Sequence, residues 1–271
     1  MNNFVKRTLS GALFITLIIG SILLNRYTFA IVFGLICGLS VLEFNKLTNN
    51  QDNISVNKWI SFFGSIILFF ISFFIASGVF KNSIFGFYGL YLVAVFIIEL
   101  YRKKTNPLHN LSYFILSQVF IALPFSLLSF ILFINNYQPI LLLAVFVTIW
   151  VNDTGAYLVG VTFGKHRLFE RISPKKSWEG FIGGALATLL SGYIFSLIIP
   201  EISLINWLIF SEIILVFGTF GDLLESLMKR TVQVKDSGNI IPGHGGLLDR
   251  FDSMLLAAPI IFIYLNFLYQ K

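Results

Sequence analysis

Long apolar runs separated by short polar segments dominate the chain. A helix that crosses the hydrocarbon core of a bilayer needs roughly 20 mostly apolar residues. Nine segments meet or approach this length: 9–24, 28–47, 59–80, 84–101, 111–134, 139–160, 178–199, 204–228 and 252–269. Their apolar positions are continuous rather than alternating, so strands are not expected. We therefore predict an all-α polytopic transmembrane helix bundle of about nine spans, forming one integral membrane domain over residues 1–271.

The composition supports a membrane protein. Hydrophobic residues make up 56% of the chain and charged residues only 12%, whereas soluble domains carry about 25% charged residues. The net charge of +6 is attributed to basic loops near anionic lipid, and no nucleic-acid partner is expected. The single cysteine, Cys37, excludes a disulfide framework and a cysteine-rich metal site.

The basic residues predict the orientation of the spans. If the N-terminus is cytoplasmic and nine spans alternate, all but three of the 19 lysines and arginines lie inside; the exceptions are Arg26, Lys81 and Lys271. This asymmetry follows the positive-inside rule. The C-terminus is then outside, and the loops 161–177 and 229–251 share the cytoplasmic face. The first apolar run lacks a cleavage site and is interpreted as an uncleaved span.

The polar residues that could carry chemistry concentrate in the second half of the chain. We therefore divide the domain into N-terminal spans, 1–138, and catalytic spans with cytoplasmic loops, 139–271. The segment Ser226–Asp252 combines cations, carboxylates and glycines, which predicts a phosphate and metal site at the membrane surface. Its ionisable residues are Lys229, Arg230, Lys235, Asp236, His244, Asp249, Arg250 and Asp252.

Two acidic residues lie near the cytoplasmic end of the eighth span. Asp222 and Glu225 share a helix face with Ser226 and Lys229. A carboxylate at membrane depth is costly and normally has a partner or a function. For Asp222 a functional role is favoured, because Gly218 and Gly221 permit close backbone approach beside it. For Glu225 a role in the site and an ion pair with Lys229 or Arg230 both stay open.

A magnesium ion often takes one or two protein carboxylates together with substrate phosphates. Asp222 and Asp249 are the predicted pair, with Asp252 and Asp236 as alternatives, and an ion pair between Asp249 and Arg250 is the competing interpretation. The Gly245-Gly246 backbone is predicted to turn N–H groups towards an anion. His244 is interpreted as a phosphate or nucleotide contact.

A second polar cluster follows the sixth span. Asn152 and Asp153 interrupt an apolar run and are predicted to face the protein interior. Lys175 and Lys176 precede Ser177, a candidate helix cap, and a helix N-terminus beside two lysines attracts phosphate. The remaining polar residues receive no site role: Glu43 and Glu212 are isolated in the sequence, and His109 and His166 are expected to be solvated.

The segment Ser226–Asp252 resembles the signature of the phosphatidate cytidylyltransferases, also called CDP-diacylglycerol synthases. The upstream segments NDTGAY and SPKKSWEG are also similar to this family. The resemblance covers the second half closely and the first half only as apolar spans. The matching signature positions are Ser226, Met228, Lys229, Arg230, Lys235, Asp236, Gly238, Pro242, His244, Gly245, Gly246, Asp249, Arg250 and Asp252.

The resemblance implies transfer of the cytidylyl group of CTP to phosphatidic acid, which gives CDP-diacylglycerol and pyrophosphate for phospholipid synthesis. It implies an enzyme of the bacterial cell (inner) membrane with its active site facing the cytoplasm. Family members require Mg²⁺ and are described as holding K⁺ beside it on two aspartates, here Asp222 and Asp249. The sequence leaves a homodimer open.

The expected roles follow from bringing two polyanions together. Asp222 and Asp249 would hold the metal, and Asp153 would complete the cation site. Lys175 and Lys176 would hold the lipid phosphate or the leaving group, and the Gly245-Gly246 backbone would cradle phosphate. The groups expected to neutralise the triphosphate are Lys229, Arg230 and Lys235.

Two other functions compete. A CTP-dependent kinase acting on a lipid alcohol would transfer the γ-phosphoryl group instead of the cytidylyl group. A transporter would use Asp153, Asp222 and Glu225 as an intramembrane ion path. The fully matched signature favours cytidylyl transfer.

Overall fold

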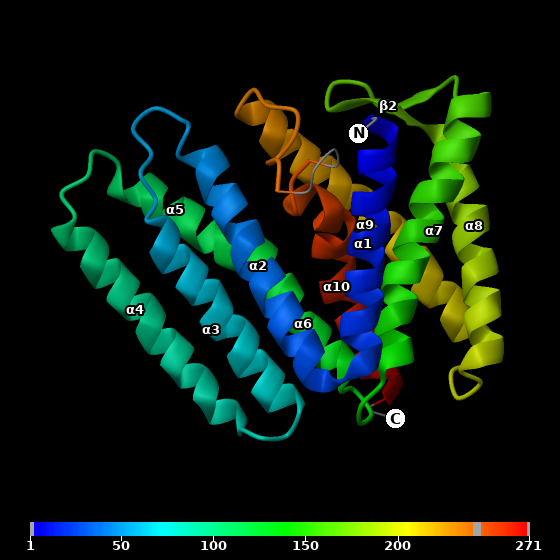
Figure 1. Cartoon of the computed structure of the whole chain (residues 1–271), viewed down its shortest axis with the longest axis horizontal. Helices are drawn as coiled ribbons and strands as arrows, with labels where there is room; N and C mark the ends of the chain where they lie inside the picture. The colour runs from blue at the N-terminus through cyan, green and yellow to red at the C-terminus, as the bar shows by residue number, and fades with distance from the viewer. Residues whose placement is uncertain (1–2, 241–244, 270–271) are drawn as a thin grey trace.

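The computed structural model of the chain describes residues 3–240 and 245–269, and this part is a bundle of long helices (Figure 1). Helix α1 is followed by a left-hand group, α2 to α6, and a right-hand group, α7 to α10. The helices are α1 (Asn3–Leu24), α2 (Arg26–Thr48), α3 (Lys58–Ala76), α4 (Phe85–Tyr101), α5 (Pro107–Leu116), α6 (Leu123–Leu132), α7 (Pro139–Phe163), α8 (Trp178–Ile198), α9 (Leu204–Thr231) and α10 (Leu248–Tyr269), with the short 3-10 turn η1 (Asn82–Ile84) before α4.

Each of the nine predicted spans corresponds to a helical segment. In the described part of the chain, eight are long and apolar enough to cross a membrane, while the apolar part of α1, Thr8–Leu24, is shorter. The fifth span is composite, because α5, the π-helical turn η2 (Ser117–Ala122) and α6 form one rod. Pro124 has no N–H to donate back along this rod, and such a missing donor favours a local π-turn.

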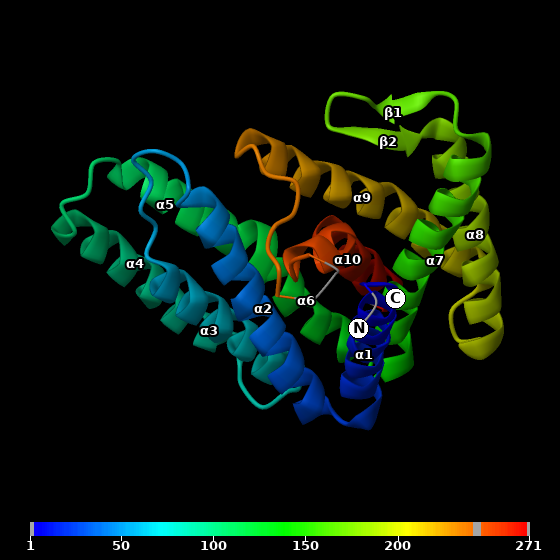
Figure 2. The ribbon, with the colours of Figure 1, turned by 45° about the horizontal axis from the view of Figure 1, so that its top comes forward.

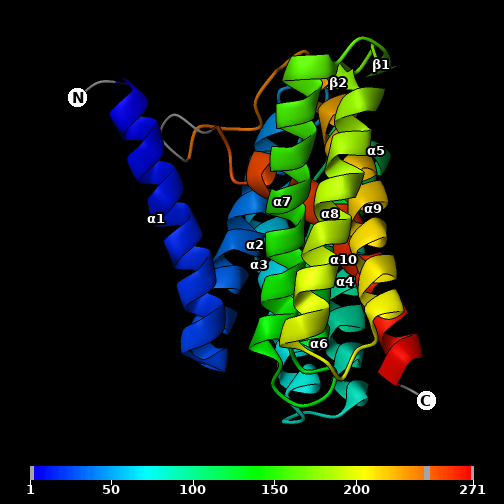
Figure 3. The same ribbon diagram turned by 90° about the vertical axis from the view of Figure 1, so that its right-hand side faces the viewer.

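The start of α1 and the end of α10 lie at opposite ends of the bundle (Figures 1 and 3), as an odd number of crossings requires. The hairpin after α7 and the segment that follows α9 lie at the same end of the bundle (Figure 2). The two loops that the sequence predicts on one membrane face therefore lie at the same end of the bundle.

The loop after α7 departs from an all-α chain, because it forms a short β-hairpin. Strands β1 (Arg167–Phe169) and β2 (Ser173–Ser177) pair antiparallel, with Arg167 opposite Ser177 and an irregularity between Arg167 and Phe169. The expectation of no strands was wrong here because it rested on the spans alone. A polar loop must also pair its backbone groups, and a hairpin does so locally.

Ser177 ends the hairpin and begins α8. Its side-chain oxygen accepts a hydrogen bond from the Gly180 N–H at 3.1 Å. The predicted helix cap is thereby confirmed. The cap fixes the direction in which Lys175 and Lys176 leave the helix start, because both residues lie on β2 immediately before it.

Phe251, on α10, is the aromatic centre of the core. Its ring lies 5.1 Å from the ring of Phe125 on α6 and 5.7 Å from that of Phe14 on α1, centroid to centroid. The rings of Phe33 on α2 and Phe146 on α7 lie at 6.3 and 6.2 Å. Such edge and tilted ring contacts stabilise packing beyond area burial alone. The helix that carries Asp249 and Asp252 is therefore anchored to four other helices.

Helices α9 and α10 approach closely beside Asp222. A Cβ atom at Gly221 would lie only 2.5 Å from the carbonyl oxygen of Asp252. Only glycine fits this crossing, as is common where membrane helices touch. The close approach that the sequence predicted at this position is confirmed, and it brings Asp222 near α10.

Candidate active site

Four aspartates line one pocket of about 360 Å³ between α1, α7, α9 and α10. They are Asp153, Asp222, Asp249 and Asp252, and Arg250 joins them. A second pocket of about 310 Å³ lies under the hairpin and is lined by Lys175 and Lys176. Asp153, Asp222 and Ser253 line both pockets. The two polar clusters of the sequence therefore meet at Asp153 and Asp222.

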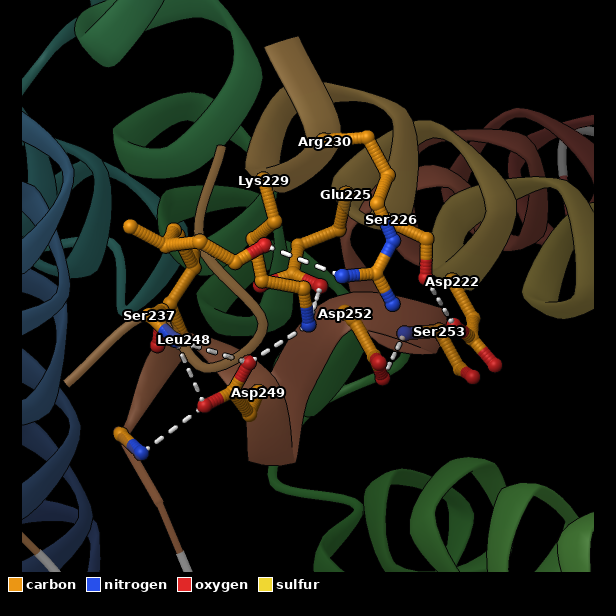
Figure 4. A network of polar contacts seen from close by, with 12 residues as sticks. Asp222, Glu225, Ser226, Lys229, Arg230, Ser237, Leu248, Asp249, Asp252 and Ser253 are labelled. Carbon is orange, nitrogen blue, oxygen red and sulfur yellow. Dashed lines mark hydrogen bonds and ion pairs between the residues drawn. The ribbon is translucent and has the colours of Figure 1, made fainter. Parts of the chain in front are cut away.

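Asp222 joins the two pockets through its contacts. Its Oδ2 atom lies 2.6 Å from the Lys176 Nζ. Its Oδ1 atom accepts a hydrogen bond from the Ser226 hydroxyl at 3.2 Å, as Figure 4 shows. The predicted helix-face neighbour Ser226 is thus confirmed. Lys176 comes from the hairpin, so one ion pair fixes β2 over the C-terminal half of α9.

Asp249, in the first turn of α10, is held from several sides. Its Oδ1 atom lies 2.6 Å from the Lys229 Nζ, and its Oδ2 atom accepts from the backbone N–H of Ser237 at 3.0 Å and of Gly246 at 2.9 Å (Figure 4). The competing pair with Arg250 is not the one formed, because Lys229 approaches from α9. Asp249 therefore fixes the backbone at two points of the segment between α9 and α10, Ser237 and Gly246.

Lys229 is buried, with its ammonium between the carboxylates of Glu225 and Asp249. Of the partners considered for Glu225, Lys229 is the one with which it forms an ion pair. The side chain of Glu225 is 1% exposed and that of Lys229 11%, and burying such charges is tolerated only when they are paired. The sequence predicts that Lys229 neutralises the triphosphate. In the structure its ammonium instead contacts two carboxylates.

The carboxylates of Asp153 and Asp252 complete the acidic wall. Asn152 is buried as predicted, whereas Asp153 is exposed and faces the pockets. Asp252 accepts a hydrogen bond from the adjacent Ser253 N–H at 2.6 Å. Asp153, Asp222 and Asp252 lie near enough to repel one another electrostatically. Within residues 3–240 and 245–269, however, no three His, Cys, Asp or Glu side chains converge tightly enough to hold a metal ion by themselves.

The other predicted phosphate ligands are spread around this wall. Lys175, Lys235 and Arg230 are exposed, and Arg230 donates a hydrogen bond to the carbonyl of Val234 at 3.1 Å. Gly245 has a φ of 82°, a conformation that favours glycine. The Gly246 N–H points at Asp249 in this structure, so it is already paired. His244 lies outside the described residues.

Sequence reasoning missed two contacts around the site. Glu43, interpreted as isolated, is buried on α2 and accepts a hydrogen bond from the Leu248 N–H at 2.9 Å. His166, expected to be solvated, is exposed but its Nδ1 lies 2.6 Å from Glu179 Oε1. Glu43 is more than 200 positions from its partner, and no spacing rule links such residues.

Comparison with known proteins identifies the family. The model of the cytidylyltransferase family matches residues 5–268. A phosphatidate cytidylyltransferase of Bacillus subtilis (strain 168) is 39% identical over 195 residues, 72% of this chain and 71% of that protein. Phosphatidate cytidylyltransferases of Staphylococcus saprophyticus and Haemophilus influenzae are 46% and 43% identical over 125 and 132 residues.

The Staphylococcus and Haemophilus matches cover 46% and 47% of this chain and 48% and 46% of those proteins, so each spans about half of the relative's length. The family match, by contrast, includes the N-terminal spans, where the sequence offered only apolar runs. With nearly the whole chain matched and the signature residues Asp249 and Asp252 on one pocket wall, this chain belongs to the cytidylyltransferase family.

Proposed function

We propose that this chain transfers the cytidylyl group of CTP to phosphatidic acid, forming CDP-diacylglycerol and releasing pyrophosphate. The observation that carries the proposal is the pair of pockets that share Asp153 and Asp222. One pocket is lined by the hairpin lysines and the other by aspartates of α9 and α10. Two anionic substrates can then meet at one wall.

The reaction is a displacement at phosphorus. An oxygen of the phosphatidate phosphate forms a bond to the α-phosphorus of CTP, while the bond from that phosphorus to the bridging oxygen breaks. Pyrophosphate leaves with the electron pair. The nucleophile is already an anion, so catalysis depends mainly on positioning and on stabilising negative charge.

The lysines are assigned to the anions. Lys175 and Lys176 would hold the lipid phosphate or the departing pyrophosphate, because both line the pocket beneath the hairpin. Arg230 and Lys235 lie exposed near the end of α9, where they can neutralise the triphosphate. Lys229 would influence the triphosphate indirectly, through Asp249, because its ammonium contacts the Asp249 carboxylate at 2.6 Å.

We assign Mg²⁺ to Asp222 and Asp249, with K⁺ as the candidate second cation and Asp153 as an additional ligand. The donor set fits: these are hard carboxylate oxygens on one pocket wall, and Mg²⁺ takes one or two carboxylates plus substrate phosphates. When bound, the ion would neutralise developing charge on the phosphate oxygens. This matches the lack of a tight three-ligand cluster among the described residues.

The membrane setting completes the proposal. The hairpin and the α9–α10 segment would face the cytoplasm, where CTP is available, in the inner membrane of a bacterial cell. The asymmetry of the lysines and arginines supports this orientation. Phosphatidic acid would remain anchored by its acyl chains in the same leaflet.

The test uses purified protein in mixed micelles with phosphatidic acid, Mg²⁺ and CTP labelled at either the α- or the γ-phosphate. Movement of α-label into lipid with release of pyrophosphate is the expected result. Movement of γ-label onto an added lipid alcohol would identify a kinase instead. If neither label moves in folded protein, the proposed function is wrong.

A further inference from the structure

Glu43 is a carboxylate of the first half of the chain that contacts the signature segment. It lies in the penultimate turn of α2 and is 5% exposed. Its Oε2 atom accepts hydrogen bonds from the Leu248 N–H at 2.9 Å and from the Ser237 hydroxyl at 3.4 Å. The segment between α9 and α10 runs beside α2 at this point (Figure 2).

The partners of Glu43 are also the neighbours of Asp249. Ser237 offers its hydroxyl to Glu43 and its backbone N–H to Asp249. Leu248 is bound to Glu43 through its own N–H and immediately precedes Asp249 in the first turn of α10. Two carboxylates from different halves of the chain therefore fix the same short backbone segment.

Two signature glycines lie against the Glu43 side chain. A Cβ atom at Gly238 would collide with Glu43 Oε1, and one at Gly246 would lie 2.6 Å from Glu43 Oε2. Glycine at these positions therefore leaves room for the carboxylate as well as for the turn. Part of the signature matches the shape of a side chain about 200 positions earlier.

We propose that Glu43 is a positioning residue for the reaction: it holds the signature segment so that Asp249 keeps its place on the pocket wall. This inference rests on the proposed function, because Asp249 belongs to the proposed metal site. Glu43 itself lines neither of the two pockets at Asp222. It acts through Ser237 and Leu248.

The experiment compares Glu43→Ala and Glu43→Gln in the labelled-CTP assay at saturating and limiting substrate. Alanine removes the acceptor, and we expect kcat/KM to fall about 10- to 100-fold, mainly through kcat, as for residues that orient metal ligands. Glutamine keeps an acceptor oxygen and is expected to stay within a few-fold of wild type. Glu99→Ala is the matched control, since Glu99 is 6% exposed on α4 and bonds to Arg102 and Asn110, away from the signature.

Hydrogen exchange separates positioning from general stability. In Glu43→Ala we expect faster exchange of peptides that contain the Leu248 amide, with the N-terminal helices unchanged. Unchanged exchange there, or a kcat/KM loss no larger than in Glu99→Ala at equal folded fraction, overturns the inference. If wild-type protein transfers no cytidylyl group, the proposed function fails, while the exchange result still decides whether Glu43 holds the segment.

A second variant tests the contact from the other side. Gly238→Ala should impair activity because the new methyl group meets Glu43. In the Glu43→Ala background that collision is absent, so the second substitution should cost much less. Such non-additivity is the mark of direct contact, and strictly additive losses in kcat/KM would contradict the proposal.

Discussion

At the residue scale, the site depends on how its carboxylates are partnered. Asp222 contacts a lysine of the hairpin, whereas Asp249 contacts a buried lysine and two backbone N–H groups. The two proposed metal ligands therefore differ in the groups that they contact. Replacement by asparagine retains the shape of each side chain but removes the charge that a cation needs.

We expect Asp222→Asn and Asp249→Asn each to lower kcat/KM by about 100-fold or more, in the range seen when one electrostatic contact to a reacting group is removed. Raising the Mg²⁺ concentration should recover part of the loss if the substitution weakens metal binding. Asp52→Asn, an exposed residue of the loop after α2, is the matched control and should remain near wild type. Full activity in either site variant would remove that aspartate from the metal site.

The buried cation at Lys229 gives a prediction about stability. Lys229→Met leaves Glu225 and Asp249 facing each other without a cation, and breaking a buried pair costs about 3–5 kcal/mol. Glu225→Gln should cost less, because Lys229 retains Asp249. Thermal unfolding in detergent should therefore rank wild type above Glu225→Gln and Glu225→Gln above Lys229→Met. Lys46→Met, at an exposed position of α2, controls for loss of charge, and the reverse ranking would contradict the assignment.

At the scale of elements, the hairpin brings Lys176 to Asp222, a contact that the hairpin's own sequence does not predict. Continuous apolar runs predicted the spans well, because membrane helices must satisfy their own backbone groups. The same reasoning says nothing about a polar loop, so the strands were missed. The cap at Ser177 was predictable, since it depends on local sequence, but the Lys176–Asp222 pair joins elements far apart in the chain.

We expect Lys176→Met to raise the apparent KM for the anionic substrates several-fold and to reduce the salt dependence of that KM, because one cation facing phosphate is lost. Initial rates at increasing KCl measure both effects. Lys165→Met removes the same charge from an exposed position before the hairpin and should leave both unchanged. Equal effects in the two variants would show that Lys176 acts only through the overall positive charge of the loops.

At the scale of the whole molecule, the two halves of the chain are less separate than the sequence suggested. The second half carries the signature, but Phe14, Phe33 and Phe125 of the first half surround Phe251. Glu43 adds a polar contact across the same boundary. Pattern reasoning assigned the chemistry to the second half, but it could not identify packing partners whose only sequence signal is hydrophobicity.

The orientation of the bundle is a prediction for labelling in intact cells. Cys37 is buried, so Cys37→Ser provides a background without thiols. Cysteines introduced at Asp52 and Lys165 should react with a membrane-impermeant maleimide only after the cells are opened. Cysteines at Lys81 and Asn136, at the opposite end of the bundle, should react in intact cells. The inverse pattern would place the active site outside and contradict the proposed supply of CTP.

Separate expression of the two halves tests how far the catalytic spans depend on the rest. Residues 139–271 alone lose three of the rings around Phe251 and the Glu43 contacts with Ser237 and Leu248. We therefore expect this fragment to show near-background cytidylyl transfer, and co-expression with 1–138 to restore activity by reassembly in the membrane. Co-expression with 1–138 carrying Glu43→Ala should restore less activity at equal assembly, whereas wild-type specific activity from 139–271 alone would show that the N-terminal spans neither anchor α10 nor position its aspartates.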